Sequence, residues 1–160
     1  MQQTDERQFS GLSGEPQALL SRNIPQEICQ KYSYQIGSWR DEKVHIAPFY
    51  YEGRQVGQKL RFKDKRFQVL GKVTDRFFGQ HLFGGGKWVV VTEGEIDAMS
   101  VATIFRGWPA VSLPCGAQGA EGVFKAQIEW LESFDTVKIC FDQDEQGQAA
   151  AIKCAQVLSP

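Results

Sequence analysis

The sequence predicts an α/β fold, in which a parallel sheet with flanking helices follows a smaller α+β subdomain. From Lys87 onward, short apolar segments alternate with segments of helical spacing, an order that is typical of βαβ units. Before Lys87, the apolar segments are joined by short polar turns, which favours an antiparallel sheet. We expect the boundary near the three glycines at residues 84–86, which form either a hinge or a tight connection.

The N-terminal subdomain is expected to occupy residues 15–86, behind a polar and flexible lead-in over residues 1–14. Residues 17–32 show helical spacing, and Pro25 is well placed to begin a second helix. Strands are predicted where apolar side chains run together or alternate with polar ones, which occurs at residues 32–39, 43–51 and 56–62.

The C-terminal subdomain is expected to occupy residues 87–160 and to alternate between strands and helices. Apolar segments predict strands at residues 87–92, 110–114 and 136–141. Segments of helical spacing predict helices at residues 96–105 and 123–131, and a final helix that Gly147 opens and that continues to residue 158. Strands as apolar as these are typical of a parallel sheet that is covered on both faces.

Carboxylate side chains follow two of these predicted strands. Glu93 lies where the first strand ends, and Asp97 shares a face with it on the helix that Gly94 allows to begin. Asp142 and Asp144 alternate just beyond the end of the last strand. Because ligands of open parallel sheets gather at the carboxyl ends of the strands, we predict one catalytic site made of Glu93, Asp97, Asp142 and Asp144.

Clustered carboxylates in a cleft cannot all stay ionised unless a cation neutralises them. Their hard oxygen atoms favour Mg²⁺ or Mn²⁺. Zinc is not indicated, because the four cysteines have no paired spacing and the two histidines are isolated. The alternative, that an individual carboxylate caps a helix or is only solvated, stays open for each of them.

A run of basic residues precedes the predicted boundary. Lys59, Arg61 and Lys63 alternate with apolar residues, so on a strand their side chains line one face, and Lys65 follows in a turn. A positive stripe of this kind suits the phosphates of nucleic acids or nucleoside triphosphates. A solvated strand face is the alternative. We treat these four residues as candidate substrate-binding residues.

The composition excludes several classes of protein. The chain has 160 residues, 42% of them hydrophobic, and a formal net charge of −1, which suits one ordinary domain or two small subdomains. No segment is long and apolar enough to span a membrane, and the polar N-terminus lacks the apolar core of a signal peptide. We therefore expect a cytoplasmic protein whose thiols are reduced.

The acidic motifs EGEID, at residues 93–97, and DQDEQG, at residues 142–147, resemble the Toprim signature of bacterial-type primases, topoisomerases and some nucleases. Other segments, in the same order, are similar to the primase half of bifunctional bacteriophage primase-helicases. They include ALLSRNIPQEICQKYSY, GQKLRFKDKRFQV and FGQHLFGGGKWVVVTEGEIDAMSV. The resemblance covers most of the chain from about Ala18 onward.

The resemblance implies a Toprim-like sheet and DNA primase activity, in which ribonucleoside triphosphates are joined into a short RNA primer on a single-stranded DNA template. It implies that Glu93, Asp142 and Asp144 hold Mg²⁺ or Mn²⁺. Asp97 would orient the site or join these ligands. Lysines that match Lys59 and Lys65 assist nucleotide or template handling in the family. The implied partners are a zinc-binding module, a hexameric helicase domain and a replicative DNA polymerase, in the cytoplasm of a host cell.

The chain departs from the family pattern. It has no Cys-rich zinc module and no helicase P-loop, and no acidic residue follows Glu145, although the family carries a further metal-site aspartate. We therefore expect a chain that is truncated at its C-terminal end. Two alternatives stay open: a non-catalytic DNA-binding module of a replicative helicase, and a Toprim nuclease or topoisomerase fragment. The intact acidic motifs argue against the first, and the likeness before Lys87 argues against the second.

Overall fold

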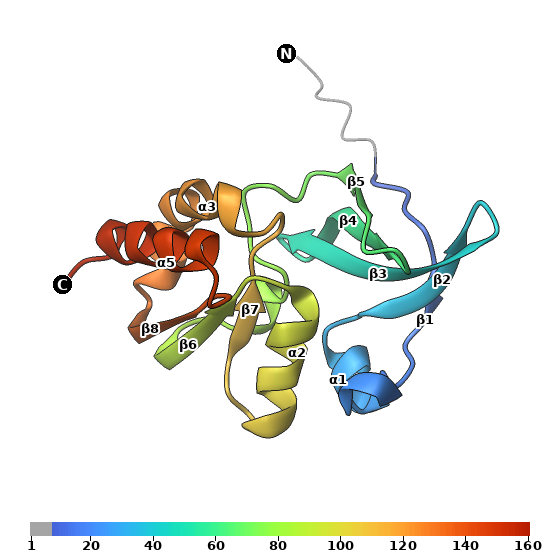
Figure 1. The fold of residues 1–160 in the computed structure, drawn as a ribbon, viewed down its shortest axis with the longest axis horizontal. Helices are drawn as coiled ribbons and strands as arrows, with labels where there is room; N and C mark the ends of the chain where they lie inside the picture. The colour runs from blue at the N-terminus through green and yellow to red at the C-terminus, as the bar shows by residue number, and fades with distance from the viewer. Residues whose placement is uncertain (1–7) are drawn as a thin grey trace, which may run out of the picture.

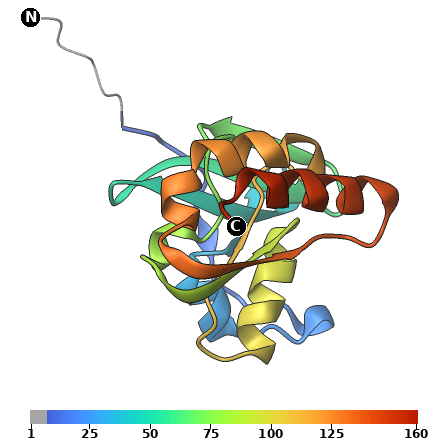
Figure 2. The ribbon, with the colours of Figure 1, turned by 90° about the vertical axis from the view of Figure 1, so that its left-hand side faces the viewer.

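The structure is a computed structural model that describes residues 8–160. It contains a five-stranded antiparallel sheet in its N-terminal half and a three-stranded parallel sheet in its C-terminal half (Figure 1). Helices cover both faces of the parallel sheet (Figure 2). The predicted α/β fold, in which a smaller α+β part precedes a parallel sheet with flanking helices, is confirmed.

The strands of the N-terminal sheet pair in sequence order: β1 (Gly14–Glu15), β2 (Gln35–Trp39), β3 (Glu42–Tyr51), β4 (Arg54–Phe62) and β5 (Phe67–Gly71). Two-residue turns join β2 to β3 and β3 to β4. Their central residues all have positive φ, which matches the right-handed twist of a hairpin: Arg40, Asp41, Glu52 and Gly53. The three predicted strands are confirmed. The strand β5 was not predicted; it follows a tight turn that Phe62 closes by donating its main-chain N–H to the carbonyl of Arg66 (2.9 Å).

The predicted helical segment over residues 17–32 is correct only in its second half. The first half is a single 3-10 turn, η1 (Leu20–Arg22), because Asn23 takes a left-handed conformation with φ of 54° and ends it. The helix α1 (Gln26–Lys31) begins directly after Pro25, as predicted. A proline suits this place because its missing N–H would have no partner inside the helix.

In the C-terminal half, the parallel strands β6 (Gly86–Thr92), β7 (Ala110–Ser112) and β8 (Phe134–Cys140) have the order β7-β6-β8. The helix α2 (Glu95–Ile104) packs on the face that presents Val90. The face that presents Val89 and Val91 packs against α3 (Ala120–Ala126) and α5 (Glu145–Val157). The remaining elements are η2 (Gln80–Leu82), η3 (Ala117–Gly119) and α4 (Ile128–Leu131).

Two predicted helices differ from the observed ones. The predicted helix over residues 123–131 is split into α3 and α4, because Gln127 has φ of −111° and breaks the helical geometry. The final helix begins at Glu145, earlier than predicted, so Gly147 lies inside its first turn. This second difference matters for the site described below.

A shared apolar core joins the two halves. Tyr32 and Phe49 contribute to it from the N-terminal half, and Ile96 and Met99 contribute from α2. The hydroxyl of Tyr32 also donates a hydrogen bond to the main-chain carbonyl of Ala110 in β7 (2.7 Å). Burial of several large apolar side chains at this junction stabilises one arrangement of the two sheets.

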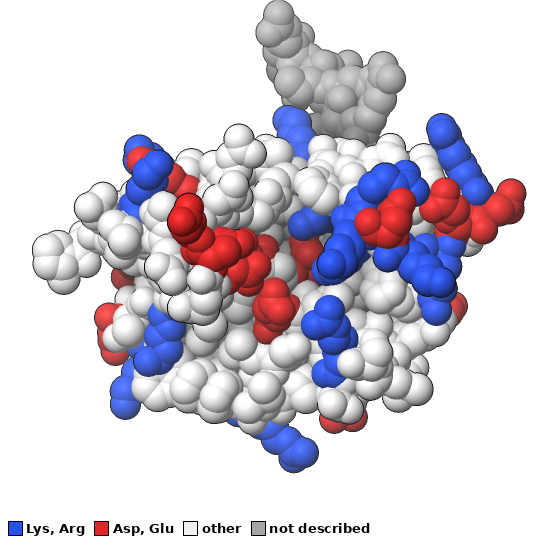
Figure 3. Space-filling model, viewed as in Figure 1, with Lys and Arg blue, Asp and Glu red and all other residues white. Residues whose placement is uncertain are grey.

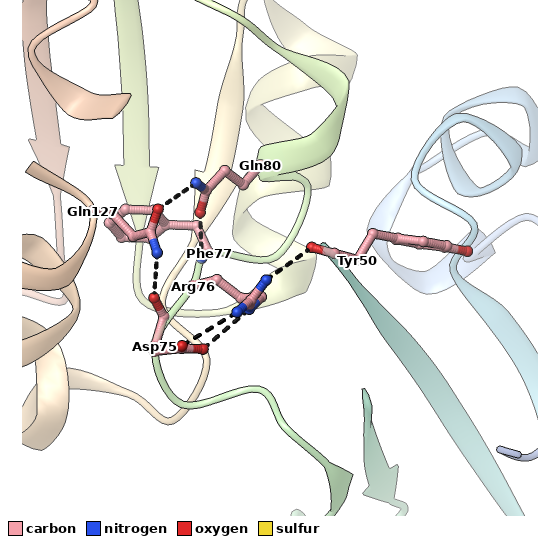
Figure 4. A network of polar contacts seen from close by, with 6 residues as sticks. All are labelled: Tyr50, Asp75, Arg76, Phe77, Gln80 and Gln127. Atoms are coloured by element: carbon pink, nitrogen blue, oxygen red, sulfur yellow. Dashed lines mark hydrogen bonds and ion pairs between the residues drawn. The ribbon is translucent and has the colours of Figure 1, made fainter. Parts of the chain in front are cut away.

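Side-chain hydrogen bonds fix the segment that connects the two sheets (Figure 4). The amide of Gln127 donates to the carbonyl of Asp75 (2.6 Å) and accepts from Gln80 (2.6 Å). The guanidinium of Arg76 pairs with Asp75 and donates to the carbonyl of Tyr50, at the end of β3 (3.4 Å). The connection is therefore held from both halves.

The predicted domain limits at residues 14 and 86 stay predictions. Residues 1–7 of the predicted lead-in lie outside the described residues. Farther along, the main chain of Leu12 exchanges two hydrogen bonds with the side-chain amide of Gln58, at 2.7 and 2.6 Å. In the part of the chain that the structure describes, no helix is long and apolar enough to cross a membrane.

Candidate active site

Four carboxylates gather at the carboxyl ends of β6 and β8, which are adjacent parallel strands. Thr92 and Cys140 are partners across the two strands, so both chains leave the sheet at the same level. Oε1 of Glu93 accepts a hydrogen bond from the main-chain N–H of Asp142 (3.0 Å). Figure 3 shows acidic side chains in the middle of this face, with basic side chains beside them over the N-terminal sheet. We define the acidic cluster as Glu93, Asp97, Asp142 and Asp144.

Glu93 lies partly buried among the other carboxylates of the acidic cluster. Burial raises the pKa of the Glu93 carboxyl above its usual value, and the negative charges of Asp142, Asp144 and Asp97 raise it further. The hydrogen bond from the main chain of Asp142 acts in the opposite direction. The two strand ends therefore bring their carboxylates close enough to interact, as the sequence predicts.

Asp97 links the acidic cluster to the basic residues. Burial is the largest cause that raises the pKa of Asp97, and the carboxylate of Asp142 adds to it. Arg22 and Arg61 both lower the pKa of Asp97. These two arginines come from η1 and β4, so the N-terminal half supplies positive charge to the edge of the cluster.

Replacing Asp97 by asparagine is expected to stabilise the metal-free protein at pH 7. The pKa of Asp97 is raised in the folded state, so the folded protein holds this proton more tightly than the unfolded chain does. The free energy of unfolding therefore falls as the pH rises above about 4, the pKa of an aspartate in the unfolded chain, and through the higher pKa of Asp97 in the folded state. In thermal unfolding over a pH series, Asp97→Asn should raise Tm at pH 7 and lose this advantage at about pH 3. Asp135→Asn, an exposed carboxylate near the start of β8, is the control; an equal gain in both variants would refute the explanation.

Asp144 has a second function as the N-cap of α5. Its Oδ1 accepts a hydrogen bond from the main-chain N–H of Gly147 (2.7 Å). A cap of this kind typically stabilises a helix by about 1 kcal/mol. Asp144 therefore caps a helix, which is the alternative that the sequence left open, and it also belongs to the acidic cluster.

Gly147 allows α5 to approach the acidic cluster closely. A Cβ atom at this position would lie 2.2 Å from the carbonyl oxygen of Asp142 and 2.7 Å from Oε1 of Glu93. Both distances are far below van der Waals contact. A glycine is therefore required where the first turn of α5 passes the two strand ends.

Gly147→Ala is expected to destabilise the protein by about 2 kcal/mol, because the added methyl group must displace the backbone of Asp142. The matched control is Gly122→Ala in α3, where an added Cβ would have no neighbour within 4 Å. Alanine is the better helix former, so the control should be stabilising by about 0.5–1 kcal/mol. Urea unfolding of both variants measures the difference. Equal effects would mean that the close approach at Gly147 has no energetic consequence.

The acidic cluster has the donor chemistry that a hard divalent cation prefers, because its ligands are carboxylate oxygens. Within residues 8–160, no three His, Cys, Asp or Glu side chains stand close enough together, as they lie, to hold an ion. Glu93 and Asp144 instead accept main-chain hydrogen bonds. Burial, followed by the neighbouring carboxylates, raises the pKa of Glu93 and of Asp97, so a cation bound here would favour their ionised forms.

The predicted basic stripe is present on β4 but is shorter than expected. Lys59 and Arg61 project from one face of the strand, while Leu60 and Phe62 are buried on the other. The strand ends at Phe62, so Lys63 and Lys65 lie in the exposed turn before β5, where Lys65 has φ of 69°. Only Lys59 and Arg61 therefore share a strand face.

Lys59 is not an exposed cation of a solvated strand face. Its Nζ lies 2.9 Å from Oε1 of Glu95, and the exposed fractions of the two side chains are only 11% and 5%. The Lys59 ammonium also lies over the ring of Phe67, 4.9 Å from its centroid. Glu95 belongs to the same motif as Glu93, yet it is directed to the N-terminal sheet.

Two family descriptions match the chain. Residues 14–71 match the family described as "Bacteriophage T7 DNA helicase/primase, N-terminal a+b fold", and residues 90–160 match a family described as "Toprim-like". The crystal structure of the primase fragment of the bacteriophage T7 primase-helicase protein is 40% identical in sequence. Its TM-score is 0.86, over 91% of this chain and 62% of that one. This chain belongs to the family of phage primase-helicase primase domains.

Other relatives agree with this membership. One is a chain in the structure of the bacteriophage T7 lagging-strand DNA polymerase interacting with primase domains bound to an RNA/DNA hybrid and dTTP. It is 39% identical, with a TM-score of 0.86, over 92% of this chain and 76% of that one. The DNA helicase/primase of Enterobacteria phage T3 is 37% identical over 153 residues, or 94% of this chain. The match spans 27% of the T3 protein.

The sequence analysis missed three residues of the site. Glu95 was overlooked because its spacing from Glu93 and Asp97 does not show which way it points. Arg22 was overlooked because η1 lies far from β4 in the sequence. Gly147 was assigned only to the start of a helix, although glycine in the first turn of a helix, next to a strand end, is a signal of close approach.

Proposed function

We propose that this chain is the RNA polymerase domain of a phage DNA primase, which synthesises short RNA primers from ribonucleoside triphosphates on single-stranded DNA. One observation carries the proposal. The acidic cluster at the ends of β6 and β8 borders the cations of β4, since Lys59 contacts Glu95 and Arg61 lowers the pKa of Asp97. Carboxylates for a metal ion and cations for phosphates are the two parts that nucleotidyl transfer requires.

Glu93, Asp142 and Asp144 would hold a divalent metal ion, which we propose to be Mg²⁺ or Mn²⁺. When bound, such an ion lowers the pKa of the primer 3′-hydroxyl and stabilises the departing pyrophosphate. Asp144 is already oriented by the N-terminus of α5, and Glu93 by the main chain of Asp142. Asp97 would orient the site from α2.

Lys59 and Arg61 would bind the triphosphate of the incoming nucleotide. In the reaction, the 3′-oxygen forms a bond to the α-phosphorus, and the bond from this phosphorus to the bridging β-phosphate oxygen breaks. The two cations would hold the negative charge of the leaving pyrophosphate. Lys63 and Lys65, in the exposed turn before β5, would extend the positive surface to the phosphates of the DNA template.

The partners of the relatives support a wider proposal. The T7 structure contains primase domains with a DNA polymerase and an RNA/DNA hybrid, and the T3 relative is a helicase/primase. We propose that this chain hands primers to a replicative DNA polymerase. In the longer protein, a zinc-binding module would read the template and a hexameric helicase domain would move along DNA, in the cytoplasm of the host.

Template-dependent incorporation of labelled ribonucleotide tests the proposal. The assay uses this chain with single-stranded DNA, Mg²⁺ or Mn²⁺, and a zinc module supplied in a longer chain or in trans. Short RNA products that require both template and metal are expected. Binding of DNA without any product, in the presence of the zinc module, would favour the non-catalytic alternative. Cleavage of the DNA would favour the nuclease alternative.

Lys65→Gln is expected to weaken binding of single-stranded DNA and to flatten its dependence on salt, with a slope smaller by about one. Each phosphate contact releases a counterion, so a lost contact removes that part of the salt dependence. The control is Lys138→Gln, on the exposed side of β8 in the other sheet. DNA affinity over a salt series measures both. The same slope in Lys65→Gln and the unchanged chain would mean that Lys65 is only solvated.

A further inference from the structure

We propose that Glu95 is a positioning residue, which holds the ammonium group of Lys59 at the border of the acidic cluster, in the place where it meets the triphosphate of the incoming nucleotide. This inference rests on the proposed primase function for the identity of the ligand. The position of Lys59 itself follows from contacts that the structure shows.

Glu95 has a different direction from the two carboxylates beside it in sequence. The side chain of Glu95 is 5% exposed and faces Lys59, whose Nζ lies 2.9 Å from Oε1. Glu93, in contrast, bonds the main chain of Asp142, on the side of β8. The residues at the start of α2 therefore contribute to two parts of the proposed site. Glu93 would bind the metal ion, and Glu95 contacts the lysine that would bind the triphosphate.

The Lys59 ammonium is restrained from two directions. Glu95 contacts it from α2, and the ring of Phe67 lies under it from β5, with 4.9 Å between Nζ and the centroid. A free lysine on a strand samples many rotamers and would have to be ordered when a ligand binds. The buried Glu95 and the ring of Phe67 together restrict the side chain in advance, which favours binding of an anion at that point.

The geometry of the ion pair leaves Lys59 able to donate hydrogen bonds to a ligand. Among the described residues, no well-aligned hydrogen bond reaches the buried Oε1 of Glu95, so the contact with Lys59 is one of charge and distance. The ammonium carries three N–H donors, and Glu95 is its one carboxylate partner among the described residues, so donors remain for a ligand. A phosphate oxygen that approaches from the side of the acidic cluster can accept one of them.

A buried ion pair is weak evidence for stability, because a well-packed apolar pair often does as well. Its presence at the junction of two sheets therefore calls for another explanation. Strands β4 and β5 and the start of α2 meet at this pair, and a lysine held at their meeting point suits recognition of a ligand.

The experiment compares Glu95→Gln, Lys59→Met and the double variant in the full chain. The first measurement is the rate at which an amine-reactive ester acylates Lys59, read from peptides by mass spectrometry. Without the negative charge of Glu95, the amine of Lys59 should be less restrained and should lose its proton more easily, so its acylation rate should rise roughly tenfold. The acylation rate of the exposed Lys65 should not change, and it serves as an internal control. If Glu95→Gln does not fold, Glu95→Asp keeps the charge but withdraws the carboxylate, and a smaller increase is expected.

The second measurement is the affinity for ATP with Mg²⁺. Glu95→Gln should weaken it about tenfold in the original background and should have no further effect in the Lys59→Met background. A merely structural role would not give this pattern. The proposal is overturned if Lys59 is acylated equally fast with and without Glu95, or if Glu95→Gln weakens ATP binding equally in both backgrounds. Absence of ATP binding and primer synthesis in the unchanged chain would instead refute the proposed function, and the acylation rates would still decide the positioning.

Discussion

Replacing Glu93 by glutamine is expected to lower template-directed ribonucleotide incorporation by at least about 100-fold while the fold persists. The substitution removes one negative charge from the acidic cluster with almost no change of shape. Burial and the neighbouring carboxylates already raise the pKa of Glu93, so the neutral side chain should not lower stability. The rate is measured in a longer chain that is active, with Mg²⁺ at a saturating concentration.

The control for Glu93→Gln is Glu129→Gln, an exposed carboxylate in the short helix α4, which should retain the original rate. Asp142→Asn is expected to behave as Glu93→Gln does, because both residues belong to the two strand ends. Unchanged primer yield from Glu93→Gln would remove Glu93 from the ligand set. An equal loss in Glu129→Gln would show that the assay responds to net charge and not to the site.

Lys59→Met is expected to lower the free energy of unfolding by about 3 kcal/mol, because it leaves the carboxylate of Glu95 buried without a cation. The double variant Lys59→Met/Glu95→Gln removes both charges and should recover most of this loss. Urea unfolding of the two single variants and the double variant gives the coupling between the two residues. Lys65→Met, at an exposed turn, is the matched control and should change stability by no more than about 0.5 kcal/mol.

If Lys59→Met did not change the free energy of unfolding, the buried ion pair would not contribute to stability as expected. Lys59 would then behave as the solvated lysine that the sequence alone suggests. A loss of similar size in the double variant and in Lys59→Met would show that packing of the lysine stem, and not its charge, stabilises the junction of the two halves.

The fold was predictable where one pattern dominates a segment. The valines before Thr92 and the apolar residues of β8 indicate buried parallel strands, and the alternation of β4 indicates a strand with one buried face. The missing strand β5 shows the limit. Its five residues carry two glycine or polar positions and an exposed Phe67, and the strand forms because β4 offers it a partner edge. Such tertiary pairing leaves little trace in the local sequence.

The sequence predicts that the acidic residues lie together at two strand ends, but it does not predict which groups they contact there. Adjacent parallel strands place Glu93 and Asp142 together by topology alone. The choice of Glu95 as the partner of Lys59 depends on how α2 packs against the N-terminal sheet, which no local spacing encodes. The capping bond of Asp144 depends on α5 beginning at Glu145, and helix ends are the least certain feature of a sequence pattern.

The most direct test of the site is the location of a bound paramagnetic ion. Mn²⁺, added in small amounts to the isotopically labelled chain, broadens the NMR signals of amides near it. The expected result is selective broadening at Gly94, Asp142 and Gly147, with little at Asp41, in the turn between β2 and β3 on the far side of the molecule (Figure 1), and loss of the effect in Glu93→Gln. Competition by excess Mg²⁺ should reverse it. Broadening that is absent from the ends of β6 and β8, or that persists unchanged in Glu93→Gln, would contradict a metal-binding active site at these carboxylates.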